Sequence, residues 1–405
     1  MFKNKNYLRL LLGQTAANLG DIFYIVAIIS LVYNTTGSAF YASWIPFVMT
    51  FSLFAAGVVT PLVLAKIHIN LLLTITQFVK TILLTMVWLI VIMTHHPSIF
   101  VLLLFIICIS FLDGFANPLK QSMIPQYVAE LELMKANSIA ESIDQVMQIA
   151  SWMIGGSLLL WLSAENVILF SVCLYGIAAT AFFFLAKIQV EKEENRSLFK
   201  QVTEGFQIIF QSKLQRSFLW IDLFESAASA VWVSAILLVY VKEVLGQSSA
   251  WWGFINAAFF AGMIGISLLM IRFDAWVQQR MKDVVLGGAI LSAGATFIFG
   301  YTSVGLIALV CSFFVGVGSQ LKGIPLQTLF QKVTPKEQLA IVYAAFHTIY
   351  TPVFGISTLV VGFLSEQMGV SSVFFFSAAC LLVVCILSKR LLRISHGVET
   401  RCSSK

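Results

Sequence analysis

Residues 99–119 read IFVLLLFIICISFLDGFANPL, and Asp113 is the only charged residue among them. A helix needs roughly 20 predominantly apolar residues to cross the hydrocarbon core of a bilayer. This run therefore has the length and composition of one membrane span. The whole chain shares its character, since 59% of the 405 residues are hydrophobic and only 11% are charged, whereas an average soluble domain is about 25% charged. The composition predicts an integral membrane protein and excludes a soluble enzyme and a nucleic-acid-binding protein.

Twelve stretches of the chain are long and apolar enough to form spans. They cover residues 11–33, 41–64, 71–94, 99–119, 138–162, 166–187, 217–241, 250–271, 284–301, 303–321, 338–364 and 370–391. We therefore predict an all-α membrane protein with twelve transmembrane helices. An even number of spans places both termini on the same side of the membrane.

The basic residues indicate which side that is. If the N-terminus is cytoplasmic, 23 of the 25 Lys and Arg residues lie in cytoplasmic connections or termini. Lys80 then lies inside a span, and only Lys242 falls outside the cell. Short cytoplasmic loops carry this excess of positive charge in membrane proteins. We predict a multi-pass protein of a bacterial cell membrane with both termini in the cytoplasm. The net charge of +6 then follows from topology and requires no nucleic-acid partner.

Short motifs recur about 200–207 residues apart and in the same order. The first members are Leu31-Val32-Tyr33 and Leu119-Lys120 with Pro125, and the second members are Leu238-Val239-Tyr240 and Leu321-Lys322 with Pro325. Internal repeats of six spans are typical of secondary transporters. We predict two six-helix halves related by a pseudo-two-fold repeat, at residues 1–190 and 217–393, with a cytoplasmic tail at 394–405.

The segment between the halves, residues 191–216, is the only long polar connection. Leu198, Val202, Phe206 and Ile209 follow each other at helical spacing, which predicts an amphipathic helix lying at the membrane surface. We interpret this helix as a connector that tethers the two halves. A regulatory or partner-binding role is the alternative.

Ionisable side chains are costly inside a bilayer, so each one within a span is a hypothesis of function. They are Asp21, Asp113, Glu141, Asp144, Asp222, Glu225 and His347, with Lys80 in the third span. The acids and the histidine lie in spans 1, 4, 5, 7 and 11. We predict that these five spans face a common hydrated cavity, and that spans 3, 6, 9 and 12 face lipid.

Helical spacing groups the polar residues into stripes that also carry aromatic side chains. The stripes are Gln14, Asn18 and Asp21; Glu141, Asp144, Gln145, Gln148 and Trp152; Asp222, Glu225, Ser229 and Trp232; and Tyr343, His347, Tyr350 and Phe354. Such a cavity suits a large, partly apolar substrate, including a cationic one. The candidates for the substrate-binding wall are Asn18, Tyr24, Gln145, Trp232, His347 and Tyr350.

A carboxyl group that is alternately hydrated and dehydrated takes up and releases a proton, because burial disfavours its charged form. Asp21 and then Asp222 are the first candidates for proton coupling, followed by Glu225, Asp113 and Asp144. Each candidate has a structural alternative. Asp21 can form a hydrogen bond within its span, and Asp113 can form an ion pair with Lys80. The other three can reach water near the cytoplasmic ends of their spans. His347 has the alternative role of a packed, hydrogen-bonded residue.

Motifs for enzyme chemistry are absent from the sequence. There is no Gly-x-x-x-x-Gly-Lys-Ser/Thr phosphate loop, no His-Glu-x-x-His and no Cys-x-x-Cys, which are the patterns for nucleotide and metal sites. We therefore expect no enzyme activity, no cofactor and no bound metal. The expected partners are a small-molecule substrate, protons and the lipid bilayer, and the protein is expected to be a monomer.

Several motifs along nearly the whole chain resemble one known family. They include Leu12-Gly13-Gln14-Thr15 with Gly20-Asp21, Thr36-Gly37-Ser38 before Pro46, Gln77 with Lys80, Asn117-Pro118 before Pro125, and Ala136-Asn137 before Gly155-Gly156. The chain resembles the major facilitator superfamily, and within it the twelve-span drug:proton antiporters that include macrolide efflux pumps and siderophore exporters. The resemblance implies the major facilitator fold and an efflux activity.

The chain also departs from this family's pattern. Members usually carry Gly-x-x-x-Asp-Arg-x-Gly-Arg-Arg between spans 2 and 3, where it acts as a conformational latch. Here Gly57 is retained, Ala65-Lys66 stands near the Asp-Arg position, and Ile69-Asn70 replaces the trailing basic pair. The sequence therefore predicts the fold of the family with an altered latch.

Our leading hypothesis is a proton-driven secondary transporter that exports an amphipathic drug-like or metabolite substrate. The first alternative is an uptake symporter or facilitator of the same fold, which accumulation of substrate in energised cells would indicate. The second alternative is a non-transporting membrane sensor or assembly protein, which binding of a partner without solute flux would indicate.

Overall fold

The computed structural model describes residues 4–36, 39–64, 66–94, 97–188, 198–232, 234–248 and 250–402. All regular secondary structure in these ranges is helical, which confirms the predicted all-α class. Apolar segments of this length form helices because every backbone N–H and C=O group must be satisfied inside a bilayer, and a helix does so within one segment.

The elements before the linker correspond to the first six predicted spans. They are α1 (Lys5–Thr36), α2 (Ala39–Leu64), α3 (Ile69–Met93), α4 (Ile99–Asp113), α5 (Ala116–Tyr127), the 3-10 turn η1 (Glu130–Glu132), α6 (Leu133–Trp161) and α7 (Ala164–Phe183). Helices α4 and α5 belong to one apolar stretch, Ile99–Tyr127, and together they form the fourth span.

The linker and the later spans follow in the same way. They are α8 (Leu198–Gln211), α9 (Lys213–Ser229), the 3-10 turn η2 (Ala230–Trp232), α10 (Ser234–Glu243), α11 (Ala250–Arg272), α12 (Asp274–Gln279), α13 (Met281–Tyr301), α14 (Gly305–Val333), α15 (Leu339–Met368) and α16 (Val370–Cys402). Helix α8 is the helix predicted in the linker. Ile209 on its predicted apolar face is fully buried, whereas the neighbouring Phe210 is exposed.

Ten helices of the described chain are long and apolar enough to cross a membrane. An eleventh crossing results if Lys213–Trp232 and Ile236–Glu243, which are bent at the break between them, count as one span. The remaining predicted stretch, residues 138–162, coincides with α6. Its N-terminal half carries the polar stripe predicted for span 5, which lowers its mean hydropathy. Twelve spans therefore account for all the long helices.

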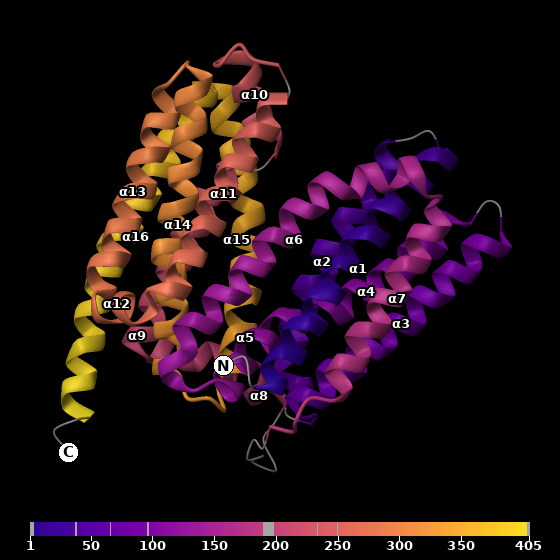
Figure 1. The fold of residues 1–405 in the computed structure, drawn as a ribbon, viewed down its shortest axis with the longest axis horizontal. Coiled ribbons are helices and arrows are strands. Elements are labelled where there is room, and N and C mark those ends of the chain that lie inside the picture. The colour runs from indigo at the N-terminus through magenta and orange to yellow at the C-terminus, as the bar shows by residue number, and fades with distance from the viewer. Residues whose placement is uncertain are drawn as a thin grey trace. The chain divides into compact units, whose positions relative to one another are not determined.

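The chain is organised in two compact units. The first contains Met1–Glu132, Val146–Phe206 and Thr334–Thr348, and the second contains Leu133–Gln145, Gln207–Val333 and Ile349–Lys405. In the first unit α7 packs on both α1 and α3, and α4 packs on α2 and α3. Figure 1 shows these helices in indigo to magenta. In the second unit α14 packs on α11 and α13, and α16 packs on α9 and α13.

Aromatic side chains fill much of the core of the second unit. Tyr240 is fully buried, and its hydroxyl shares its one hydrogen between the carbonyl oxygens of Phe299 and Thr302 at the end of α13, the second at 2.6 Å. The rings of Tyr240 and Phe374 are 4.8 Å apart. A buried hydroxyl needs such partners, because an unsatisfied polar group in an apolar interior is costly. These contacts fix α10, α13 and α16 against each other.

Candidate functional site

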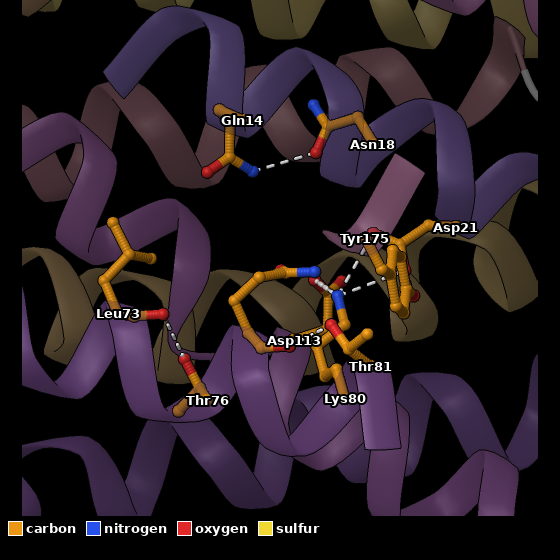
Figure 2. Close-up of polar contacts among 10 residues, drawn as sticks. Gln14, Asn18, Asp21, Leu73, Thr76, Lys80, Thr81, Asp113 and Tyr175 are labelled. Atoms are coloured by element: carbon orange, nitrogen blue, oxygen red, sulfur yellow. Dashed lines mark hydrogen bonds and ion pairs between the residues drawn. The ribbon is translucent and has the colours of Figure 1, made fainter. Parts of the chain in front are cut away.

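The polar stripe predicted on the first span lies along α1. The side-chain amide of Gln14 donates a 2.8 Å hydrogen bond from Nε2 to Asn18 Oδ1. Asp21 lies one turn further along the same face (Figure 2). Gln14 is buried, while Asn18 and Asp21 are half-buried. The predicted grouping of these three residues on one helical face is therefore confirmed.

A buried lysine joins this stripe to two other helices. Lys80 on α3 has its Nζ 3.1 Å from Asp21 Oδ1 and 2.7 Å from Asp113 Oδ1. The lysine side chain is only 2% exposed, against 15% for Asp21 and 31% for Asp113. We call Asp21, Lys80, Asp113 and Tyr175 the Lys80 cluster. The predicted ion pair between Asp113 and Lys80 is confirmed, and Asp21 shares the same ammonium group.

Tyr175 on α7 completes the cluster. Its hydroxyl donates a hydrogen bond to Asp21 Oδ1, and Lys80 Nζ lies 4.7 Å from the centre of its ring. A cation at this distance from an aromatic face is attracted by the ring quadrupole. Tyr24 on α1 packs edge-on against Tyr175, with the ring centres 6.2 Å apart. Both tyrosines are almost fully buried.

The absence of a side chain at Gly20 allows this arrangement. A Cβ atom at that position would lie 2.7 Å from Tyr175 Cδ1 and 2.8 Å from Cε1, which is closer than carbon atoms in van der Waals contact at about 3.5–4.0 Å. Small residues let transmembrane helices approach closely. The Gly20-Asp21 pair therefore combines the space for the ring with the carboxylate that accepts its hydrogen bond.

Asp113 lies near the middle of the fourth span. It is the last residue of α4, and Gly114 and Phe115 separate it from α5. Both residues keep the α conformation, and the Gly114 N–H bonds to the Ser110 carbonyl, so the span remains continuous. With 31% of its side chain exposed, Asp113 is the most exposed charged group of the Lys80 cluster.

The second unit also contains a buried lysine. Lys322 on α14 is 1% exposed, and its Nζ lies 2.6 Å from Oε1 of Glu225 on α9. The sequence predicts Lys322 in a cytoplasmic connection; in the structure it lies within α14, which continues to Val333. Asp222 lies one turn before Glu225 on the same face of α9, and its side chain is exposed.

The other candidates for the substrate-binding wall fall in different surroundings. Trp232 packs among Phe259, Phe299 and Phe374, with ring centres 5.0–6.0 Å away. Tyr350 is 38% exposed and stacks on Phe354.

Three candidates lie on helices that each contribute to both units. Gln145 on α6 is buried, and Asp144 beside it is half-buried. His347 on α15 is also half-buried. The side chain of Trp152 lies outside the described residues. The described residues contain no group of three or more His, Cys, Asp and Glu side chains able to hold a metal ion.

Sequence reasoning did not find two residues that the site depends on. Tyr175 stands in an apolar span with no charged neighbour, so nothing in its local sequence marks it. Lys322 has a signal in the repeat, because Leu321-Lys322 matches Leu119-Lys120. That match was read as a motif at the end of a span, although a lysine within an apolar helix also predicts a buried acidic partner.

Comparison with known proteins identifies the family. The model of the Major Facilitator Superfamily matches residues 10–357. The chain belongs to the Major Facilitator Superfamily. It is therefore a multi-pass membrane transporter, and its substrate is a small molecule.

Two relatives in Bacillus subtilis (strain 168) match nearly the whole chain. The protein named "Uncharacterized MFS-type transporter YfmI" is 27% identical over 406 residues, covering 99% of this chain and 100% of the relative. The protein named "Uncharacterized MFS-type transporter YjbB" is 26% identical over 400 residues, covering 97% of each.

Solved structures show the same fold at low sequence identity. A bacterial homologue of the iron transporter ferroportin in the outward-facing state has a TM-score of 0.77 at 13% identity, covering 96% of this chain and 99% of that one. The E. coli fucose:proton symporter FucP has a TM-score of 0.74 at 15% identity, covering 96% and 98%. At these identities the likeness shows the fold alone, and it confirms the predicted major facilitator fold.

Proposed function

We propose that this chain is a proton-driven secondary active transporter that exports an amphipathic drug-like or metabolite substrate from the cell. It acts as a monomer in the cell membrane with both termini in the cytoplasm, and its two six-helix halves alternate around a midplane substrate site. The observation that carries the proton-driven part of this proposal is the sharing of one ammonium group, Lys80, by two carboxyl groups.

The charge of the Lys80 cluster depends on one proton. When Lys80, Asp21 and Asp113 are all ionised, the cluster carries one uncompensated negative charge within the spans. Such a charge is costly at that depth. A single proton on either carboxyl group makes the cluster neutral. The cluster therefore has the composition of a site that takes up one proton when it is dehydrated and releases it when it is hydrated.

The contacts support different roles for the two carboxyl groups. Asp113 Oδ1 is the closer to Lys80 Nζ, at 2.7 Å against 3.1 Å for Asp21, and its side chain is the more exposed. Asp113 therefore remains the ionised partner of Lys80, and Asp21 accepts the proton. The Tyr175 hydroxyl is able to stay bonded to Asp21 in both states, because a phenol both donates and accepts hydrogen bonds.

Protonation of Asp21 changes the packing of the first unit. In the ionised state Asp21 on α1 is joined to α3 through Lys80 and to α7 through Tyr175. A neutral Asp21 has no ion pair with Lys80, so the connection between α1 and α3 weakens while that between α3 and α4 persists. This local change of charge biases which arrangement of the helices is favoured, and it links proton movement to alternating access.

The proposal is tested in inside-out membrane vesicles from cells that produce the chain. A proton gradient, acidic inside, is imposed, and accumulation of fluorescent dyes, macrolides and siderophore-like compounds is measured. Wild type is compared with Asp21→Asn and with Asp283→Asn, which makes the same change at an exposed acid at the start of α13. We expect gradient-dependent accumulation in wild type and in Asp283→Asn, and none in Asp21→Asn.

Each other result has a definite meaning. Full proton-dependent transport in Asp21→Asn would contradict the assigned role of Asp21. Accumulation in right-side-out vesicles that is driven by an inward proton gradient would mean uptake instead of export. Accumulation that persists without a proton gradient would mean a different driving force.

A further inference from the structure

The second unit contains a carboxyl group whose charge no described residue compensates. Glu225 and Lys322 form an ion pair at 2.6 Å, so their charges cancel. Asp222 lies one turn away on the same face of α9, and its side chain is exposed. None of the residues that the structure describes forms an ion pair or hydrogen bond with it. An ionisable group inside a span normally pairs with another group, so the position lacks a positive partner.

Buried polar atoms border this carboxyl group. Ser226 follows Glu225 on α9, one turn from Asp222, and its hydroxyl is fully buried without a hydrogen-bond partner in the described chain. A buried hydroxyl without a partner is costly, and a bound polar group would supply one. Glu225 is 35% exposed and uses only Oε1 for Lys322, so its second oxygen is also free to accept a hydrogen bond.

Aromatic rings of α15 lie near the same position. Tyr350 is 38% exposed and stacks on Phe354, with ring centres 6.3 Å apart and planes at 18°. Its hydroxyl is within electrostatic range of the Asp222 and Glu225 carboxylates. An exposed aromatic face beside carboxylates attracts a cation, because the ring quadrupole and the anions act in the same direction.

We propose that Asp222, with Glu225 and the Tyr350–Phe354 pair, binds the positively charged group of an organic cation. This inference rests on the proposed export function, since it takes that cation to be the transported substrate. Asp222 supplies the countercharge, Tyr350 and Phe354 contact the apolar body of the molecule, and Ser226 and Glu225 accept or donate hydrogen bonds at its polar edge.

The surrounding charges disfavour binding of an anion at Asp222, and they distinguish this site from the Lys80 cluster. Lys322 is the cation paired with the neighbouring Glu225, and it is only 1% exposed. In the Lys80 cluster both carboxylates contact the lysine, and the one negative charge left over is the charge that the proposed proton neutralises. The first unit therefore handles the proton, and the second unit recognises the charge of the substrate.

The test measures binding without transport. The full-length protein in lipid nanodiscs is titrated with tetraphenylphosphonium and with tetraphenylborate, two ions of nearly the same shape and opposite charge, and empty nanodiscs supply the background. The variants are Asp222→Asn, Asp222→Glu, Asp21→Asn and the control Asp283→Asn. We expect wild type to bind the phosphonium at least tenfold more tightly than the borate. We expect Asp222→Asn to lose at least tenfold in phosphonium affinity, and Asp222→Glu to recover most of it.

The outcomes separate this proposal from the proposed function. Phosphonium affinity that survives in Asp21→Asn and Asp283→Asn but falls in Asp222→Asn supports a cation site distinct from the proton site. Equal affinity for the borate, or unchanged phosphonium affinity in Asp222→Asn, would overturn the cation site and leave proton-driven export untouched. Loss of proton-driven flux with intact phosphonium binding would count against the proposed function alone. Because Asp222 is exposed and unpaired, its substitution is not expected to impair folding.

Discussion

Replacing Gly20 with alanine tests whether the close approach of α1 and α7 holds the Lys80 cluster together. The added Cβ atom would lie 2.7 Å from Tyr175 Cδ1, so the ring must move. Forcing an extra carbon into a packed interior costs about 1–3 kcal/mol. If the ring leaves Asp21, a hydrogen bond to a charged group is also lost, at about 1.5–3 kcal/mol. The gain in helix propensity from Gly to Ala offsets only about 1 kcal/mol.

Gly176 provides a matched control on the partner helix. It follows Tyr175 on α7, and a Cβ atom there would meet nothing within 4 Å. Gly176→Ala should therefore stabilise the protein by about 0.5–1 kcal/mol through helix propensity alone. Gly20→Ala should be less stable than Gly176→Ala by at least about 1 kcal/mol. The assay is unfolding in mixed micelles by titration with sodium dodecyl sulfate, followed by tryptophan fluorescence.

A double-mutant comparison identifies why Gly20→Ala lowers the stability of the protein. In the background Tyr175→Ala the ring is absent, so adding Gly20→Ala should have little further effect. Equal stability of Gly20→Ala and Gly176→Ala would refute the packing argument. A cost for Gly20→Ala that persists without the Tyr175 ring would show that the strain arises elsewhere.

Three further substitutions test the other contacts, all by the same unfolding assay. Lys80→Met should destabilise the protein by about 3 kcal/mol, at the lower end for a broken buried ion pair because one of its carboxylate partners is 31% exposed; an unchanged midpoint would contradict this. Glu225→Gln should cost about 3 kcal/mol, again at the lower end because the Glu225 side chain is 35% exposed, since it leaves the buried Lys322 without a countercharge. The exposed Glu366→Gln should have no measurable effect. Asn70→Ala should cost about 1–3 kcal/mol, because the Asn70 side chain forms three hydrogen bonds at 2.5–2.9 Å that fasten α3 to α5 and to the chain that follows α7. A loss of less than about 0.5 kcal/mol would mean that water replaces these bonds.

The contacts of Asn70 show what one residue of the altered motif between spans 2 and 3 does in the structure. Asn70 stands where related proteins carry a basic residue. Its amide donates to the Tyr127 hydroxyl and to the Ala186 carbonyl, and it accepts from the Ile188 N–H. From the sequence alone only the missing charges are visible. The neutral amide binds the chain where it leaves α7 through both a donor and an acceptor, and a basic side chain could not accept the hydrogen bond from the Ile188 N–H.

The sequence determined the features that depend on one helix at a time. The number of spans, the all-α class, the amphipathic helix at α8 and the shared face of Gln14, Asn18 and Asp21 follow from hydropathy and from helical spacing. These patterns are local, because a helix satisfies its own backbone and its side chains repeat every 3.6 residues.

Only the tertiary structure decided which of these residues meet. Asp21, Lys80, Asp113 and Tyr175 come from four different helices, and Lys322 reaches Glu225 from a helix about a hundred residues away. Trp232 shares the predicted stripe of Asp222 and yet packs into an aromatic core, because the 3-10 turn η2 interrupts the helix at that point. Contacts between helices depend on how each helix is rotated about its axis and how closely two backbones approach. The missing Cβ atom of Gly20 allows the short distance between α1 and α7. The spacing of residues within a single span gives no information about that distance.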